Sequence, residues 1–401
     1  MKKSKTATAV AFLAVLSICF VLVLAGVVRV GLGLQRPVAL SYYRPEEGVT
    51  YSGVVEWVKD TCRAFCTTEL PGREMLTEAN ASINRAAGKW IFESTDPEVV
   101  RLNNGHLGSL GNYYYYLTMP NRSIAALRDF AEEELGAPFL YIQAPSKLCS
   151  VDDQLPIENM TNNNAEASWL LRRLKEDGVD YLDLRETLHA DGLDHYDCFY
   201  VTDHHWTMET GLWAARAMAE ELNERYDLGM DVDILDPAGY TTRTWEDAFL
   251  GSQGRKVTLS FASPEDFTML LPTFETSLRL TVPPWGTEAA GDFDILYDED
   301  GIVSDDYYRS NSYGAVMMGD CPYVKVENLN NPDGPVVAVL RESFAIAPGP
   351  YLSLAAGELH LLDARYYTGS IKERLFEIQP DVVVSLLNVQ CHTGAYFDMI
   401  Q

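Results

Sequence analysis

An acid, two adjacent histidines and a tryptophan occupy four consecutive positions, residues 203–206, in a chain that contains only seven histidines. A serine nucleophile needs a histidine base, and that histidine needs an acid to fix its tautomer. Asp203 lies two residues before His205, so its carboxylate can orient that imidazole locally. The other ring nitrogen then stays free for a serine from elsewhere in the chain. The spacing therefore points to nucleophilic acyl transfer.

A serine in a suitable position follows the apolar run 336–340. The run predicts a buried parallel strand, and a helix is expected at 345–356. Ligands of open parallel sheets bind beyond the carboxyl ends of the strands, where N–H groups at the start of a helix can stabilise an anion. A serine that only caps the helix would occupy the same position. We predict that Ser343 meets Asp203 and His205 in space.

Two other interpretations of the histidine motif are open. Adjacent histidines and a carboxylate are competent metal ligands, but the further clustered aspartates of Asp-His-His metallo-phosphoesterases are not evident here. His204 and His205 could also be satisfied core histidines beside Trp206. We favour catalysis, and we expect neither a metal nor another cofactor. The sequence has no Gly-x-Ser-x-Gly segment, so an α/β-hydrolase elbow is not supported.

Helical and strand-like patterns alternate along most of the chain, which is typical of a parallel sheet covered by helices on both faces. Thr207 is a plausible N-cap for the helix after the histidine motif, and an Asn-Gly turn predicts a hairpin near 103–108. Residues 227–330 break the alternation and predict an insertion with β character. We expect a three-layer α/β/α domain. Its predicted helices are 124–135, 167–174, 208–226, 345–356 and 371–378, and its predicted strands are 139–142, 179–184, 336–340, 358–362 and 382–387.

The N-terminus predicts the cellular compartment. Three lysines precede an uncharged run at 6–28, which is long enough to span a bilayer as a helix. The basic flank predicts that the N-terminus stays in the cytoplasm. We therefore predict a cytoplasmic tip and transmembrane signal anchor at 1–29, a linker at 30–50, and an extracytoplasmic domain at 51–401, which places the protein at the cell membrane with a single span. A cleaved signal peptide is the alternative.

Charge and cysteine content narrow the function classes. The formal net charge of −27 repels polyanions, so we expect no nucleic-acid partner. An even number of cysteines outside the anchor permits disulfides in an exported chain. Two of them, Cys62 and Cys66, are four residues apart, an awkward geometry for a bridge on a regular helix. The others are too widely spaced for a zinc site, and we interpret the cysteines as buried or singly bridged. They are Cys62, Cys66, Cys149, Cys198, Cys321 and Cys391.

The segment 199–207, Phe-Tyr-Val-Thr-Asp-His-His-Trp-Thr, resembles the defining motif of the bacterial DHHW family. That family is similar to the alginate O-acetyltransferases of the AlgJ and AlgX type, within the SGNH hydrolase-like superfamily. The resemblance covers most of the chain after about residue 50. It extends to residues 104–105, 144–147, 249–252, 341–344, 363–367 and 380–384.

The resemblance implies a role for each residue of the motif. Asp203 would orient His205, His205 would be the general base, and Ser343 would be the nucleophile. The acid and the base then precede the nucleophile in the chain, a permuted order relative to ordinary SGNH hydrolases. His204 would be a neighbour of the site, and Trp206 would pack beneath the loop.

The resemblance also implies an oxyanion hole. Its donors would be the Ser343 backbone N–H and a second group, for which Gly251 and Asn388 are candidates. The turn before the serine departs from the family pattern, in which an aspartate usually precedes it. Here Arg341 and Glu342 stand there. We expect Arg341 either to bring positive charge to a carboxylate substrate or to form a surface salt bridge.

The function implied by the resemblance is O-acetylation of a cell-surface or exported polysaccharide through a serine acyl-enzyme. A multi-pass membrane acyltransferase would supply the acyl group, and the anchor would hold the protein in the bacterial cell envelope. A carbohydrate esterase or deacetylase would use the same three residues. A non-catalytic glycan-binding or scaffold subunit of an export complex is the alternative from a different class.

Overall fold

The computed structural model describes Ser17, Val21 and residues 73–92, 98–110, 118–148, 154–156, 163–303 and 306–388. The predicted anchor and linker fall outside these residues, apart from Ser17 and Val21. Among the described residues, no helix combines the length and the apolar character needed to span a membrane. Two units make up the chain, Met1–Ala87 and Gly88–Gln401. In the first, α3 runs over Arg73–Ala86; all other elements below belong to the second.

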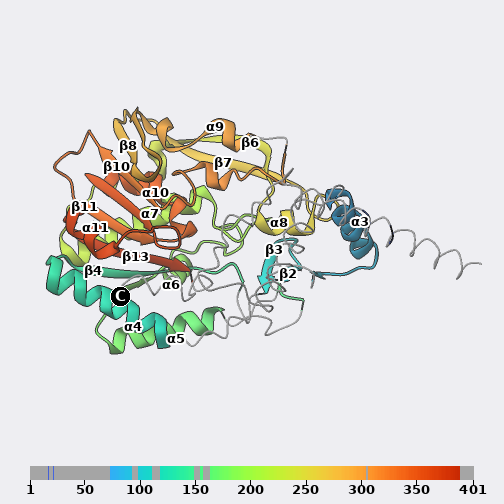
Figure 1. The fold of residues 1–401 in the computed structure, drawn as a ribbon, viewed down its shortest axis with the longest axis horizontal. Coiled ribbons are helices and arrows are strands. Elements are labelled where there is room, and N and C mark those ends of the chain that lie inside the picture. The colour runs from blue at the N-terminus through green and yellow to red at the C-terminus, as the bar shows by residue number, and fades with distance from the viewer. Residues whose placement is uncertain are drawn as a thin grey trace, which may run out of the picture. The chain divides into compact units, whose positions relative to one another are not determined.

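An eight-stranded sheet forms the centre of the second unit (Figure 1). Its order is β5-β4-β13-β11-β12-β10-β8-β9. The first five strands in this order are parallel, and the last three are antiparallel to their neighbours. The strands are β4 (Phe139–Ala144), β5 (Tyr181–Asp183), β8 (Leu278–Val282), β9 (Thr287–Gly291), β10 (Tyr323–Asn328), β11 (Val336–Arg341), β12 (Glu358–Asp363) and β13 (Val382–Asn388).

The predicted α/β fold is confirmed, but the sheet is mixed rather than wholly parallel. The antiparallel part comes from the segment that was predicted as a β-containing insertion. In β8, buried and half-buried residues alternate, as expected for a strand with only one face against the core. A single turn of 3₁₀ helix (Pro283–Trp285) joins β8 to β9, so these strands form a hairpin, for which a parallel crossover would be too short.

Helices cover both faces of the sheet, because alternate residues of each strand point to opposite sides. In β4, Leu140 and Ile142 belong to one core, whereas Phe139 and Tyr141 belong to the other. In Figure 1, α4 and α5 lie together on one side of the strands. The first core includes α6 (Leu184–Ala190), α7 (Met208–Tyr226) and α10 (Gly349–Ala355), and the second includes α4 (Thr118–Asp129), α5 (Asn163–Glu176) and α11 (Ile371–Ile378).

Smaller elements surround the sheet. The predicted hairpin near 103–108 is present as the antiparallel pair β2–β3, whose turn contains Gly105 in a left-handed conformation (φ 93°). The remaining elements are β1 (Ile91–Phe92), β2 (Glu98–Arg101), β3 (Leu107–Leu110), β6 (Tyr240–Phe249), β7 (Glu265–Pro272), α8 (Ser252–Val257), α9 (Glu299–Ile302), the π-helix Phe130–Leu135, and the 3₁₀ turns Asp233–Leu235, Pro237–Gly239, Phe293–Leu296, Tyr313–Ala315 and Ser343–Ile346.

The helix predicted at 345–356 is broken in two. One turn of 3₁₀ helix (Ser343–Ile346) precedes α10. Pro348 and Pro350 have no N–H to donate to the preceding turn, so the helical hydrogen bonds are interrupted there and α10 begins anew with Pro350 in its first turn. Ser343 thus lies in a short turn directly beyond β11, and it is not the cap of a long helix.

Candidate active site

The histidine motif lies on a loop whose two ends are fixed to each other. The Thr207 N–H donates to the carbonyl of Cys198 at 2.9 Å, and the Tyr200 N–H donates to the carbonyl of His205 at 3.2 Å. Thr207 is the N-cap of α7, as predicted, and its hydroxyl accepts from the N–H of Thr210. We call residues 200–205 the motif loop.

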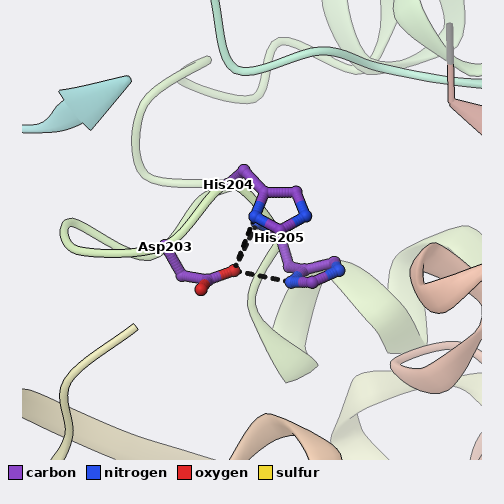
Figure 2. Close-up of side chains that lie close together, drawn as sticks. All are labelled: Asp203, His204 and His205. Carbon is purple, nitrogen blue, oxygen red and sulfur yellow. Dashed lines mark hydrogen bonds and ion pairs between the residues drawn. The ribbon is translucent and has the colours of Figure 1, made fainter. Parts of the chain in front are cut away.

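Asp203, His205 and Ser343 form a continuous hydrogen-bonded chain. His205 Nδ1 lies 2.5 Å from Asp203 Oδ1, and His205 Nε2 lies 2.8 Å from Ser343 Oγ. The His205 backbone N–H also donates to Asp203 Oδ1 at 3.0 Å. Figure 2 shows one oxygen of the Asp203 carboxylate facing a ring nitrogen of each histidine. The structure therefore brings the three predicted residues together, with the serine supplied from the end of the sheet.

The electrostatics of the loop favour an ionised acid. Burial alone would raise the pKa of the Asp203 carboxyl, but His204, His205 and the Ser252 N–H together hold it well below its ordinary value. The Ser252 N–H donates to Asp203 Oδ2 at 2.5 Å. Burial and the neighbouring His205 lower the pKa of His204 to about 3, so its ring is neutral at pH 7. Asp203 is thus a carboxylate able to hold the proton of His205 on Nδ1.

The hydroxyl of Ser343 faces a second acceptor besides His205. Glu342 Oε2 lies 3.1 Å from Ser343 Oγ, and the Glu342 side chain is fully buried. Its other oxygen accepts from the backbone N–H of Asn388 at 3.1 Å. Because the hydroxyl has a single proton, only the orientation toward His205 Nε2 prepares the oxygen for attack. The sequence showed an acid before the serine but not that it touches the hydroxyl.

Aromatic rings support the imidazole of His205. The ring of Tyr313 is stacked on it, with centroids 4.2 Å apart and 14° between the planes. The Tyr313 hydroxyl donates to the carbonyl of Ser343 at 3.0 Å, so one side chain contacts both residues. Trp206 is fully buried beside the loop, and its indole N–H donates to the carbonyl of Phe344 at 2.9 Å. Tyr313 was not predicted, because it lies in an irregular segment without a motif.

The two candidate oxyanion residues lie near the site, but their N–H groups have other partners. The Gly251 N–H donates to Thr202 Oγ1 at 2.8 Å. The Asn388 backbone N–H donates to Glu342, and its side-chain amide donates to the carbonyl of Pro145 at 2.9 Å. In this arrangement both residues brace the loops around the site.

Arg341 does not take either position expected for it, because it is fully buried. Its Nη2 donates to the carbonyls of Gly319 and Cys321 at 2.7 and 2.9 Å, and its Nη1 lies 3.8 Å from Asp363. The guanidinium therefore ties the ends of β11 and β12 to the segment before β10. Neither a substrate contact nor a surface salt bridge fits this position, since the side chain is closed off from solvent.

The metal interpretation can be tested against the same geometry. Ligand atoms of Asp203, His204 and His205 lie within 4.8 Å of one another. However, both oxygens of Asp203 accept hydrogen bonds, and both ring nitrogens of His205 lie within hydrogen-bond distance of a partner. A metal ligated by this group would have to displace Ser343 or separate the acid from the base. The contacts present are those that proton transfer requires.

The cysteines that the structure describes, Cys198 and Cys321, are buried free thiols. Burial raises the pKa of the Cys198 thiol to about 11, so it is protonated and unreactive at neutral pH. Cys19, Cys62, Cys66, Cys149 and Cys391 lie outside the described residues.

Part of the chain matches the sequence model of a known protein family. Residues 120–255 match the family model of the SGNH hydrolase-like domain, acetyltransferase AlgX. The matched segment includes Asp203 and His205 and ends before Ser343. No curated protein is similar enough in sequence to match. The resemblance predicted from the histidine motif is confirmed.

Solved structures share the fold. Bacillus cereus PatB1 with a sulfonyl adduct is 20% identical, with a TM-score of 0.61 over 77% of this chain and 98% of that one. A DHHW family protein from Eubacterium siraeum is 17% identical, with a TM-score of 0.58 over 76% of this chain and 95% of that one. These likenesses span nearly the whole of the two solved structures and about three quarters of this chain, and they show a common fold.

Proposed function

We propose that the protein is an extracytoplasmic O-acyltransferase that moves an acyl group, most simply acetyl, to a hydroxyl of a cell-surface polysaccharide. The observation that carries the proposal is the position of His205, whose two ring nitrogens contact Asp203 and Ser343 at 2.5 and 2.8 Å. An acid, an imidazole and a hydroxyl in this order are the parts of a serine acyl-transfer site.

The reaction follows from that order. Ser343 Oγ attacks the acyl carbonyl carbon while its proton passes to His205 Nε2, and Asp203 stabilises the imidazolium that forms. His205 then gives the proton to the departing group, which leaves an ester on Ser343. In the second half, a sugar hydroxyl attacks this ester, His205 takes its proton, and Ser343 regains a proton as it leaves. The backbone N–H of Ser343 is the proposed oxyanion donor.

The choice of acyl group and acceptor rests on the family resemblance. The matched model is that of an acetyltransferase, which supports acetyl over other acyl groups. We propose that the N-terminal anchor keeps the domain on the outer side of the cell membrane. There a multi-pass membrane acyltransferase would provide the donor, since a domain outside the cytoplasm has no access to acetyl-coenzyme A.

The test is an acceptor-dependent transfer assay with the full-length protein. p-Nitrophenyl acetate serves as the acetyl donor, and polysaccharide fractions from bacterial cell envelopes serve as acceptors. We expect the wild type to form acetylated glycan at the expense of free acetate, and Ser343→Ala to form neither. Release of acetate unaffected by any glycan would make the protein an esterase. Glycan binding that survives in Ser343→Ala, with no turnover in the wild type, would make it a scaffold subunit.

A further inference from the structure

Lys147 is a buried cation directly beneath the motif loop. It follows β4 by three residues and is only 3% exposed. Its ammonium group donates to three backbone carbonyls, those of Tyr200 at 2.6 Å, Val201 at 3.0 Å and Asp203 at 2.8 Å. An ammonium has three N–H donors, so all of them can be used on this one loop.

Glu265, the first residue of β7, binds backbone N–H groups of the same loop. Its Oε1 accepts from the Thr202 N–H at 2.6 Å and from the Thr202 hydroxyl at 2.5 Å, and its Oε2 accepts from the Val201 N–H at 2.7 Å. Both side chains therefore bind the backbone of residues 200–203: Lys147 binds its carbonyl groups, and Glu265 binds its N–H groups. Burial acts to lower the pKa of the Lys147 ammonium, whereas the carboxylates of Glu265 and Asp203 act to raise it and favour the charged form. Two buried charges of opposite sign remain tolerable because each is surrounded by hydrogen-bond partners.

The stretch that they hold ends in Asp203, the acid of the proposed triad. A movement of this backbone would carry the carboxylate with it, along with the imidazole that it orients. Misplacing reacting groups by about 1 Å costs around 100-fold in rate. Neither Lys147 nor Glu265 is among the contacts of Ser343 Oγ, which are His205 and Glu342.

We propose that Lys147 and Glu265 form a charged clamp on the backbone of residues 200–203 and thereby set the position of the Asp203–His205 pair. Lys147 and Glu265 are then positioning residues for acyl transfer. This inference rests on the proposed function for its effect on rate, but its effect on the Asp203–His205 hydrogen bond can be measured without turnover. Lys147 and Glu265 are 118 positions apart in the sequence, one after β4 and the other at the start of β7.

The test compares Lys147→Met with the exposed control Lys175→Met. We expect Lys147→Met to lower kcat for p-nitrophenyl acetate about 100-fold and to leave KM within about twofold, while the control matches the wild type. Glu265→Gln is the second variant. It removes the charge without changing the shape, so it keeps the test valid if Lys147→Met does not fold. A melting curve for each variant separates positioning from stability alone, because a purely structural residue would lower Tm and leave kcat of the folded protein unchanged.

A second readout is independent of catalysis. The proton between His205 Nδ1 and Asp203 should give a far-downfield proton NMR signal, assigned by its loss in Asp203→Asn. We expect this signal to shift or disappear in folded Lys147→Met and in Glu265→Gln. An unchanged signal together with wild-type kcat in the folded variants would overturn the clamp. If the wild type itself shows no Ser343-dependent turnover, the proposed function fails, and the NMR comparison still decides whether the clamp holds the pair.

Discussion

Replacing Asp203 by asparagine would change the hydrogen-bond chemistry of the site while preserving its shape. Three N–H groups point at the Asp203 carboxylate: His205 Nδ1, the His205 backbone N–H and the Ser252 N–H. An asparagine has one acceptor oxygen and an NH₂ group, so its NH₂ must face at least one of these donors. If the oxygen stays on Ser252, the NH₂ faces His205 Nδ1. The imidazole is then favoured with its proton on Nε2 and cannot accept the proton of Ser343.

The expected loss is large, because the wrong tautomer removes the base. In serine triads such a change costs about 10⁴-fold in kcat, which corresponds to roughly 5.5 kcal/mol of transition-state free energy. We expect this loss for Asp203→Asn in p-nitrophenyl acetate turnover, with KM little changed. Asp194→Asn is the matched control, since Asp194 is exposed and its side chain accepts a local hydrogen bond from the Tyr196 N–H. If Asp203→Asn retained more than a tenth of wild-type kcat and melted normally, the assigned role of Asp203 would be wrong.

Three further predictions concern packing, pH and metals. A Cβ on Gly251 would lie 2.3 Å from Asp203 Cβ, so Gly251→Ala should destabilise the protein by about 1–3 kcal/mol and lower kcat at least tenfold. In the control Gly239→Ala the added Cβ would lie 3.5 Å from its nearest neighbour, so neither stability nor kcat should change. Urea unfolding and turnover assays measure the two effects. Burial lowers the pKa of His360 from 6.5 to about 4, so the folded state binds fewer protons than the unfolded chain between these values. The free energy of unfolding should therefore fall as pH drops from 6.5 to 4, and His360→Gln should remove roughly 3 kcal/mol of that fall. Parallel plots of unfolding free energy against pH for the wild type and His360→Gln would refute the lowered pKa of His360. Turnover should survive EDTA, whereas a loss reversed by zinc or manganese would support a metal on the histidine motif.

The parts of the site that were predictable from the sequence depend on short spacings. Asp203 and His205 are two residues apart, and the loop closes locally, so their contact needs no knowledge of the fold. Ser343 follows an apolar run, and the carboxyl end of such a strand is where a parallel sheet exposes polar groups. Alternation of strand and helix patterns then indicated a sheet with helices on both faces.

The remaining features depend on contacts between distant segments. Glu265 lies 63 residues from Thr202, and its ordinary strand position gives no sign that it binds the motif loop. Tyr313 reaches His205 from an irregular segment, and no periodicity marks it. The antiparallel edge of the sheet was missed because β8 and β9 are short and are separated from the other strands by irregular chain. The break in the helix predicted at 345–356 was also missed, although Pro348 and Pro350 stand within that segment.

The most direct test of the account is to look for the acyl-enzyme itself. Full-length wild type and Ser343→Ala would be exposed briefly to p-nitrophenyl acetate, and their intact masses would be compared before and after. The account predicts that the wild type gains the mass of one acetyl group, located on Ser343 by peptide mapping, and that Ser343→Ala gains none. Equal labelling of both proteins, or a label in the wild type on any residue other than Ser343, would contradict it.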